Sequence, residues 1–179
     1  MAAHEIITFW LMPAAPAGQF FTTLIGDLAA RAGAPVFEPH VTLSAGKIDA
    51  ATALRVLPQM QQQCEPLELE IERIDSSAEF TKTLFVQFRP SPAASALSLA
   101  IANAVGGGEE YEFDPHLSLL YKEMPPRDKD ALAHEIVLPF SSAVFDRVKV
   151  VAMTAPITTR EQVEAWRPLG EGDLTGAGI

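Results

Sequence analysis

A six-residue pattern occurs twice in this chain, and each copy carries a histidine and a hydroxyl side chain. The copies are Glu38-Pro39-His40-Val41-Thr42-Leu43 and Asp114-Pro115-His116-Leu117-Ser118-Leu119. In both copies the hydroxyl follows the histidine by two positions, so on a β-strand the two side chains point to the same face. Two such strands lying side by side would bring two imidazoles and two hydroxyls to one place.

This set of side chains suits acid–base chemistry on a phosphodiester. A neutral imidazole can take a proton from water, and an imidazolium can give one to the departing oxygen. The hydroxyls of Thr42 and Ser118 could hold the non-bridging oxygens, where negative charge increases in the transition state. Two histidines without nearby carboxylate or cysteine ligands make a poor zinc site, so we expect no metal and no cofactor.

A single copy of the pattern would favour a structural role, because a buried histidine and a strand threonine are both ordinary core residues. The second copy, with its hydroxyl at the same offset, favours a joint active site instead. Glu38 and Asp114 precede the prolines, and we interpret them as structural or supporting groups.

Composition limits the kinds of partner. The chain has 179 residues, 48% of them hydrophobic, and a formal net charge of −10, which disfavours long nucleic acids but permits a small anionic ligand. Cys64 is the single cysteine, so no intrachain disulfide can form. The sequence contains no apolar run long enough to span a membrane and its start does not resemble a signal peptide. We expect a cytoplasmic protein, with a monomer as the default.

The remaining sequence predicts the elements that position the two motifs. Apolar periodicity and capping residues predict helices over 19–32, 49–63, 92–105 and 125–136. Strand formers predict strands over 6–12, 39–46, 67–72, 83–88, 114–122, 145–154 and 165–169. Each half then contains a strand, a helix, a motif strand, a helix and a further strand, which indicates a duplication with a pseudo-two-fold axis near the motif strands. We expect one two-lobed domain over 1–179, with a flexible tail at 170–179.

Two further features have open interpretations. Gly106-Gly107-Gly108 interrupts the third helix and is a candidate lid or substrate-facing loop, but no Gly-Lys-Ser/Thr follows it, as a P-loop would require. Lys82 is expected on a central strand, where it could neutralise substrate charge or simply face solvent.

The motifs resemble the paired His-x-Thr/Ser-x motifs of the 2H phosphoesterase superfamily. Residues 8–13, 37–43 and 113–121 further resemble the cyclic phosphodiesterase branch known from plants and yeast. The resemblance implies an α+β, two-lobed, LigT-like fold in which antiparallel sheets flank a central cleft.

The resemblance also implies a reaction and a set of roles. Members of this branch hydrolyse ADP-ribose 1″,2″-cyclic phosphate or nucleoside 2′,3′-cyclic phosphates to 1″- or 2′-phosphates, without a metal. By position, His40 and His116 form the acid–base pair, Thr42 and Ser118 bind the phosphate, and Tyr121 and Trp10 match aromatic residues of the site. Both aromatic side chains could instead belong to the core. We favour His116 as the base and His40 as the acid.

Two alternatives belong to other functional classes. An RNA 2′,3′-cyclic phosphodiesterase or 2′-5′ RNA ligase would share the motifs, but the net charge of −10 disfavours it. A non-catalytic nucleotide-binding module would keep the cleft without turnover, and the intact histidines and hydroxyls disfavour that alternative.

Overall fold

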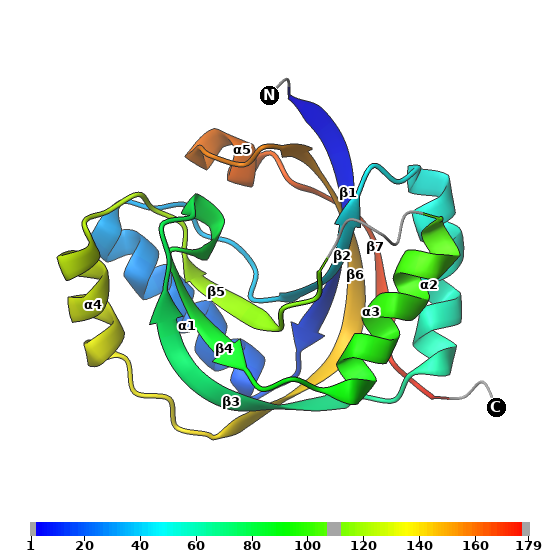
Figure 1. Cartoon of the computed structure of the whole chain (residues 1–179), viewed down its shortest axis with the longest axis horizontal. Helices are drawn as coiled ribbons and strands as arrows, with labels where there is room; N and C mark the ends of the chain where they lie inside the picture. The colour runs from blue at the N-terminus through cyan, green and yellow to red at the C-terminus, as the bar shows by residue number, and fades with distance from the viewer. Residues whose placement is uncertain (1–2, 107–111, 177–179) are drawn as a thin grey trace.

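The computed structural model describes residues 3–106 and 112–176. It has the predicted α+β architecture, with helices outside a strongly curved antiparallel sheet (Figure 1). The helices are α1 (Ala17–Ala32), α2 (Ala50–Gln63), α3 (Pro92–Val105), α4 (Pro126–Glu135), α5 (Arg160–Glu164) and a 3₁₀ turn, η1 (Phe80–Lys82). The strands are β1 (His4–Pro13), β2 (Val41–Gly46), β3 (Leu67–Ser76), β4 (Leu84–Phe88), β5 (His116–Leu120), β6 (Ser142–Ala155) and β7 (Arg167–Asp173).

The order of elements confirms the repeated layout predicted for the two halves. β1-α1-β2-α2-β3 is followed by β4-α3-β5-α4-β6, and α5 and β7 are added at the end. The last strand of each half pairs with the first strand of the other half, because β3 lies beside β4 and β6 lies beside β1. All seven strands in the described part of the chain form one sheet, in the order β1-β2-β5-β4-β3-β6-β7 with an additional β1–β6 pairing. We call β1, β2, β6 and β7 the first lobe and β3, β4 and β5 the second lobe.

The two motif strands are neighbours at the junction of the lobes. β2 and β5 run antiparallel and pair through Val41 and Leu117. Each of these residues directly follows a motif histidine, so the pairing is symmetric about the junction. The prediction that the motif strands lie side by side is confirmed.

The helices cover the outer surfaces of the lobes. α2 and α3 lie against the first lobe, and α1 and α4 lie on the side of the second lobe (Figure 1). The predicted caps are present: Asp49 accepts a hydrogen bond from the Thr52 amide at the start of α2, and Ser91 accepts one from the Ala94 amide at the start of α3. Gly33 ends α1 with a φ of 63°, a left-handed conformation that glycine adopts without steric cost.

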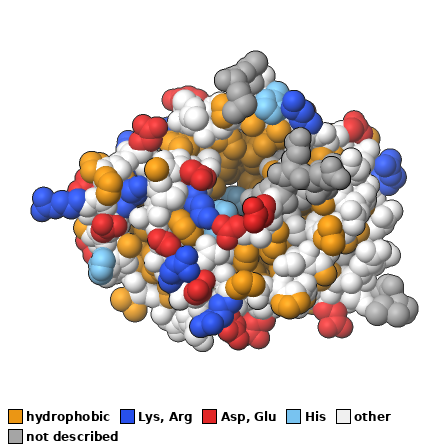
Figure 2. Space-filling model, in the orientation of Figure 1, with side chains coloured by type: hydrophobic (Ala, Val, Ile, Leu, Met, Phe, Trp, Pro, Cys, Tyr) orange, Lys and Arg blue, Asp and Glu red, His pale blue; other side chains and the backbone are white. Residues whose placement is uncertain are grey.

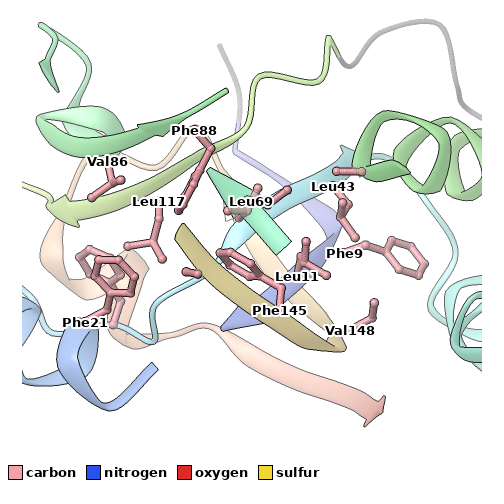
Figure 3. Close-up of a cluster of buried hydrophobic side chains, with 14 of the residues drawn as sticks. Phe9, Leu11, Phe21, Leu43, Leu69, Val86, Phe88, Leu117, Phe145 and Val148 are labelled. Carbon is pink, nitrogen blue, oxygen red and sulfur yellow. The ribbon is translucent and has the colours of Figure 1, made fainter. Parts of the chain in front are cut away.

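Strand alternation separates the hydrophobic core from the candidate site. Phe9 and Leu11 of β1, Leu43 of β2 and Leu117 of β5 belong to one continuous core, part of which Figure 3 shows. The intervening positions of the same strands face the other way, and Trp10 packs in a separate small cluster. Burying each large apolar side chain stabilises the fold by about 1.5–3 kcal/mol, so the core holds the strands firmly in this register.

The structure corrects several predictions. Residues 170–173 belong to β7, and Leu174 is buried, so the predicted flexible tail is wrong for this part of the chain. α5 was not predicted from the sequence, and β7 begins and ends later than the strand predicted over 165–169. Lys82 lies in η1 and not on a strand.

Of the predicted glycine loop, the structure describes only the first residue. Gly106 caps α3, while Gly107 and Gly108 lie outside the described residues. Among the described residues, none of the helices is both long and apolar enough to cross a bilayer.

Candidate active site

A cavity of ≈ 220 Å³ lies between the lobes, and all six residues singled out from the sequence line it. They are Trp10, His40, Thr42, His116, Ser118 and Tyr121. Figure 2 shows the surface hollowed between the lobes, with hydrophobic side chains deep inside the hollow. The structure thus brings together residues as far apart in the sequence as Trp10 and Tyr121.

Both histidine rings are held by the same local contact. Nδ1 of His40 lies 2.7 Å from the Glu38 carbonyl oxygen, and Nδ1 of His116 lies 2.8 Å from the Asp114 carbonyl oxygen. A carbonyl oxygen can only accept, so Nδ1 carries the hydrogen in each ring. Nε2 is consequently the nitrogen left to exchange a proton. The intervening prolines fix this turn by restricting their own φ and the residue before them.

The two rings have different surroundings. His40 is buried and stacks on Trp10, with ring centroids 3.7 Å apart and planes 11° apart. Burial, assisted by the nearby charges of His116 and Lys149, lowers the pKa of His40 to about 4. Burial also lowers the pKa of His116, but the Asp114 carboxylate, 3.5 Å from Nδ1, opposes that effect. His40 is therefore the more strongly neutral imidazole.

The hydroxyl groups sit beside the histidines. Ser118 is buried and donates a hydrogen bond of 2.8 Å to the Thr81 carbonyl oxygen. The phenol of Tyr121, whose pKa burial raises above its usual range, lies next to Ser118. Tyr121 stacks on Phe37 with centroids 3.8 Å apart, so it both packs in the core and lines the cavity.

Each motif carboxylate holds a lysine. Nζ of Lys82 lies 2.5 Å from Asp114 Oδ2, and Nζ of Lys149 lies 2.6 Å from Glu38 Oε2. Asp114 also accepts a hydrogen bond from Gln87, at 2.9 Å. Lys82 reaches the cavity wall, whereas Lys149 does not. The two motif acids, Asp114 and Glu38, thus form ion pairs with lysines and are not themselves part of the cavity lining.

Sequence reasoning missed several cavity residues, of which Trp166 is the largest. Its ring packs edge-on against Trp10, His40 and Tyr121, at centroid distances of 5.3, 6.2 and 5.9 Å. Trp166 immediately precedes β7, within the strand predicted over 165–169, and no motif in the sequence marks it as a site residue. The other missed residues are Ile6, Thr8, Ala45, Glu79, Thr81, Met153 and Ile157.

The donor set does not resemble a metal centre. Within 3–106 and 112–176, no three histidine, cysteine or acidic side chains gather closely enough to hold a metal ion. The site instead presents imidazoles, hydroxyls, one lysine and the Glu79 carboxylate, and its imidazoles, hydroxyls and lysine are groups suited to binding an anion.

A match to a protein-family model shows which family the chain belongs to. Residues 28–155 match the 2′-5′ RNA ligase superfamily, and that match covers more than half of the chain. The chain belongs to this superfamily, that of the 2H phosphoesterases. The resemblance inferred from the two motifs is confirmed.

Individual 2H phosphoesterases resemble the chain over nearly its whole length. A cyclic phosphodiesterase of Arabidopsis thaliana is 22% identical, with 95% of this chain and 96% of the relative covered. A 2′,3′-cyclic-nucleotide 3′-phosphodiesterase of Phaeosphaeria nodorum is 25% identical, with 93% and 98% covered.

Solved structures show the same fold. Escherichia coli LigT, crystallised with 3′-AMP, has a TM-score of 0.58 at 15% identity, covering 96% of this chain and 98% of LigT. A protein of Thermus thermophilus has a TM-score of 0.65 at 11% identity, covering 97% and 98%. The predicted two-lobed, LigT-like fold is confirmed.

Proposed function

We propose that the protein hydrolyses small cyclic phosphates, using His40 and His116 as its acid–base pair and no metal ion. The proposed substrates are ADP-ribose 1″,2″-cyclic phosphate and nucleoside 2′,3′-cyclic phosphates, with 1″- or 2′-phosphates as products. The observation that carries the proposal is the matched pair of imidazoles in one cavity, each fixed through Nδ1 by the carbonyl two residues earlier.

The surroundings of the two rings favour His40 as the base and His116 as the acid, which is the reverse of the assignment expected from the sequence. His40 is the more strongly neutral ring, so we assign it as the base that takes a proton from water through Nε2. His116 has a carboxylate neighbour and would gain a proton more readily beside a bound phosphate anion. The water oxygen bonds to phosphorus, the ring P–O bond breaks, and His116 gives its proton to the departing oxygen.

The remaining cavity groups have roles in binding. Thr42 and Ser118 lie beside the two histidines, where their hydroxyls can hold the non-bridging oxygens of the phosphate once the Ser118 O–H turns from the Thr81 carbonyl oxygen to the ligand. Lys82 adds a positive charge to the same wall, next to His116. The rings of Trp10 and Trp166 form an apolar wall that suits the flat or carbon-rich part of a substrate.

Two observations support a small substrate over an RNA. The net charge of −10 would repel a polynucleotide, and Glu79 stands at the cavity wall beside Lys82. The names of the Arabidopsis and Phaeosphaeria relatives point to cyclic phosphodiester substrates. Because the superfamily is named after RNA ligases, the experiment must also include an RNA with a 2′,3′-cyclic phosphate end as the alternative substrate.

The proposal is tested with purified protein in EDTA. Wild type, His40→Ala and His116→Ala are each incubated with ADP-ribose 1″,2″-cyclic phosphate, the four nucleoside 2′,3′-cyclic phosphates and an RNA oligonucleotide ending in a 2′,3′-cyclic phosphate. We expect wild-type turnover of the small substrates and its loss in both variants. Exclusive turnover of the oligonucleotide would favour the RNA alternative, and binding without turnover would favour a non-catalytic module.

A further inference from the structure

The carboxylate of Glu38 belongs to a charged cluster behind His40, away from the cavity. Nζ of Lys149, on β6, lies 2.6 Å from Glu38 Oε2 and 3.2 Å from Glu171 Oε2. Glu171 lies on β7, in the segment after 155 where the match to the superfamily model ends. Three distant parts of the chain therefore meet at one ammonium group.

Lys149 is the least exposed member of this charged cluster. The Lys149 side chain is 11% exposed, whereas those of Glu38 and Glu171 are 55% and 47% exposed. A nearly buried ammonium needs compensating carboxylates, and removing a partner from such a group is costly. Burial acts to lower the pKa of Lys149, but the two carboxylates raise it above its ordinary value, so it stays charged.

The cluster continues into the active site through the backbone. The Glu38 carbonyl oxygen is the acceptor that fixes His40 Nδ1, at 2.7 Å. Pro39 connects the two residues and stiffens the turn. We propose that Lys149, held by Glu171 of β7, is a positioning residue that sets the orientation of His40 through Glu38.

The second histidine is anchored differently. Asp114 is held by Lys82, which lines the cavity and lies over the Phe85 ring, at 4.5 Å from its centroid. A bound phosphate would compete with Asp114 for Lys82, whereas Lys149 lies outside the cavity lining. A phosphate bound in the cavity would therefore not compete with Glu38 for Lys149.

The proposal rests on the proposed function only for its effect on turnover, so its main test needs no substrate. The test records the His40 ring nitrogens by NMR during a pH titration of wild type, Lys149→Met and Lys149→Arg. The titratable and charged groups acting on His40 are His116 from β5 and Lys149 from β6. Because the Lys149 charge lowers the pKa of His40, Lys149→Met should raise it, and Lys149→Arg should restore it toward the wild-type value.

Activity gives a second readout. We expect Lys149→Met to lower kcat by about tenfold to hundredfold, with little change in KM, because a misplaced ring affects the reaction more than binding. Glu38→Gln keeps the backbone acceptor and leaves Glu171 as the carboxylate partner of Lys149, so it should fold even if Lys149→Met does not. It should lower kcat without raising the pKa of His40.

Arg167→Met is the matched control. It breaks an exposed ion pair of 2.7 Å with Glu5, which links β7 to β1, and leaves Glu38 untouched. The proposal is overturned if folded Lys149→Met keeps the His40 tautomer and pKa, or if Arg167→Met impairs kcat equally. If wild type turns over no cyclic phosphate while the NMR shifts occur, the proposed function fails and the positioning role stands.

Discussion

The indole of Trp10 lies flat against the imidazole of His40, with centroids 3.7 Å apart and planes inclined by 11°. This contact excludes water from one face of the ring and contributes to its burial. Trp10, which the sequence analysis left open between core and site, thus serves both: it is 3% exposed and still lines the cavity.

Replacing Trp10 should therefore change a titration as well as stability. Trp10→Leu is expected to raise the pKa of His40 toward its ordinary value, because the smaller side chain admits water to the ring. It should also lower the free energy of unfolding by about 2–4 kcal/mol. An NMR titration and urea unfolding measure the two effects, and an unchanged pKa in the folded variant would contradict the explanation.

Loss of either histidine should abolish turnover while the fold remains. We expect His40→Ala and His116→Ala each to lower kcat by about 10²- to 10⁴-fold, the range typical of a lost general acid or base. Steady-state kinetics on the substrate that wild type turns over best measures this loss. His134→Ala, at an exposed position on α4, is the control and should behave as wild type.

The buried, neutral His40 should make stability depend on pH in a definite direction. Its pKa is about 4 in the folded protein and about 6.5 when unfolded, so between these values the unfolded chain binds more protons. The free energy of unfolding should consequently fall as pH drops from 6.5 to 4, by about 3 kcal/mol for this group. Urea unfolding across this range should show a shallower slope for His40→Asn, and an equal slope would contradict the assignment.

Ser118 should matter more than an ordinary buried hydroxyl. Ser118→Ala removes a hydroxyl that can turn from the Thr81 carbonyl oxygen to a bound phosphate, so kcat should fall by about a hundredfold. Thr22→Ala is the control, since Thr22 Oγ1 donates to the Gly18 carbonyl oxygen on the exposed face of α1. Equal kinetics in the two variants would remove Ser118 from the proposed mechanism.

Chelation should leave the activity unchanged. The polar cavity side chains among the described residues are imidazoles, hydroxyls, a lysine and a glutamate, which do not make a metal-binding set. We expect the same kcat before and after dialysis against EDTA. A loss that is restored by a divalent cation would show that the proposed mechanism is incomplete.

Much of this arrangement could be predicted from the sequence, because it depends on residues that are close together within each motif. The spacing of His40 and Thr42 fixes their common face, and the repeat places His116 and Ser118 opposite them. The alternation of apolar residues, the caps at Asp49 and Ser91, and the glycine after α1 fix the elements between the motifs.

The remainder depends on tertiary contacts that leave no local pattern. Trp166 reaches the cavity because β7 pairs with β6. A single aromatic residue before a strand is not enough to predict that contact from the sequence. Lys149 looks like any strand lysine until Glu38 and Glu171 are brought beside it. Residues 170–173 contain two glycines, a composition typical of a frayed end, yet they form backbone hydrogen bonds at the edge of the sheet.

The exchange of final strands between the two halves has a consequence for how the chain can be divided. β3 is made by the first half but completes the lobe of the second, and β6 does the reverse. The arrangement is that of a domain-swapped dimer joined into a single polypeptide. A fragment containing one half would therefore expose an unpaired strand edge, and the two fragments would be complementary to each other, not self-sufficient.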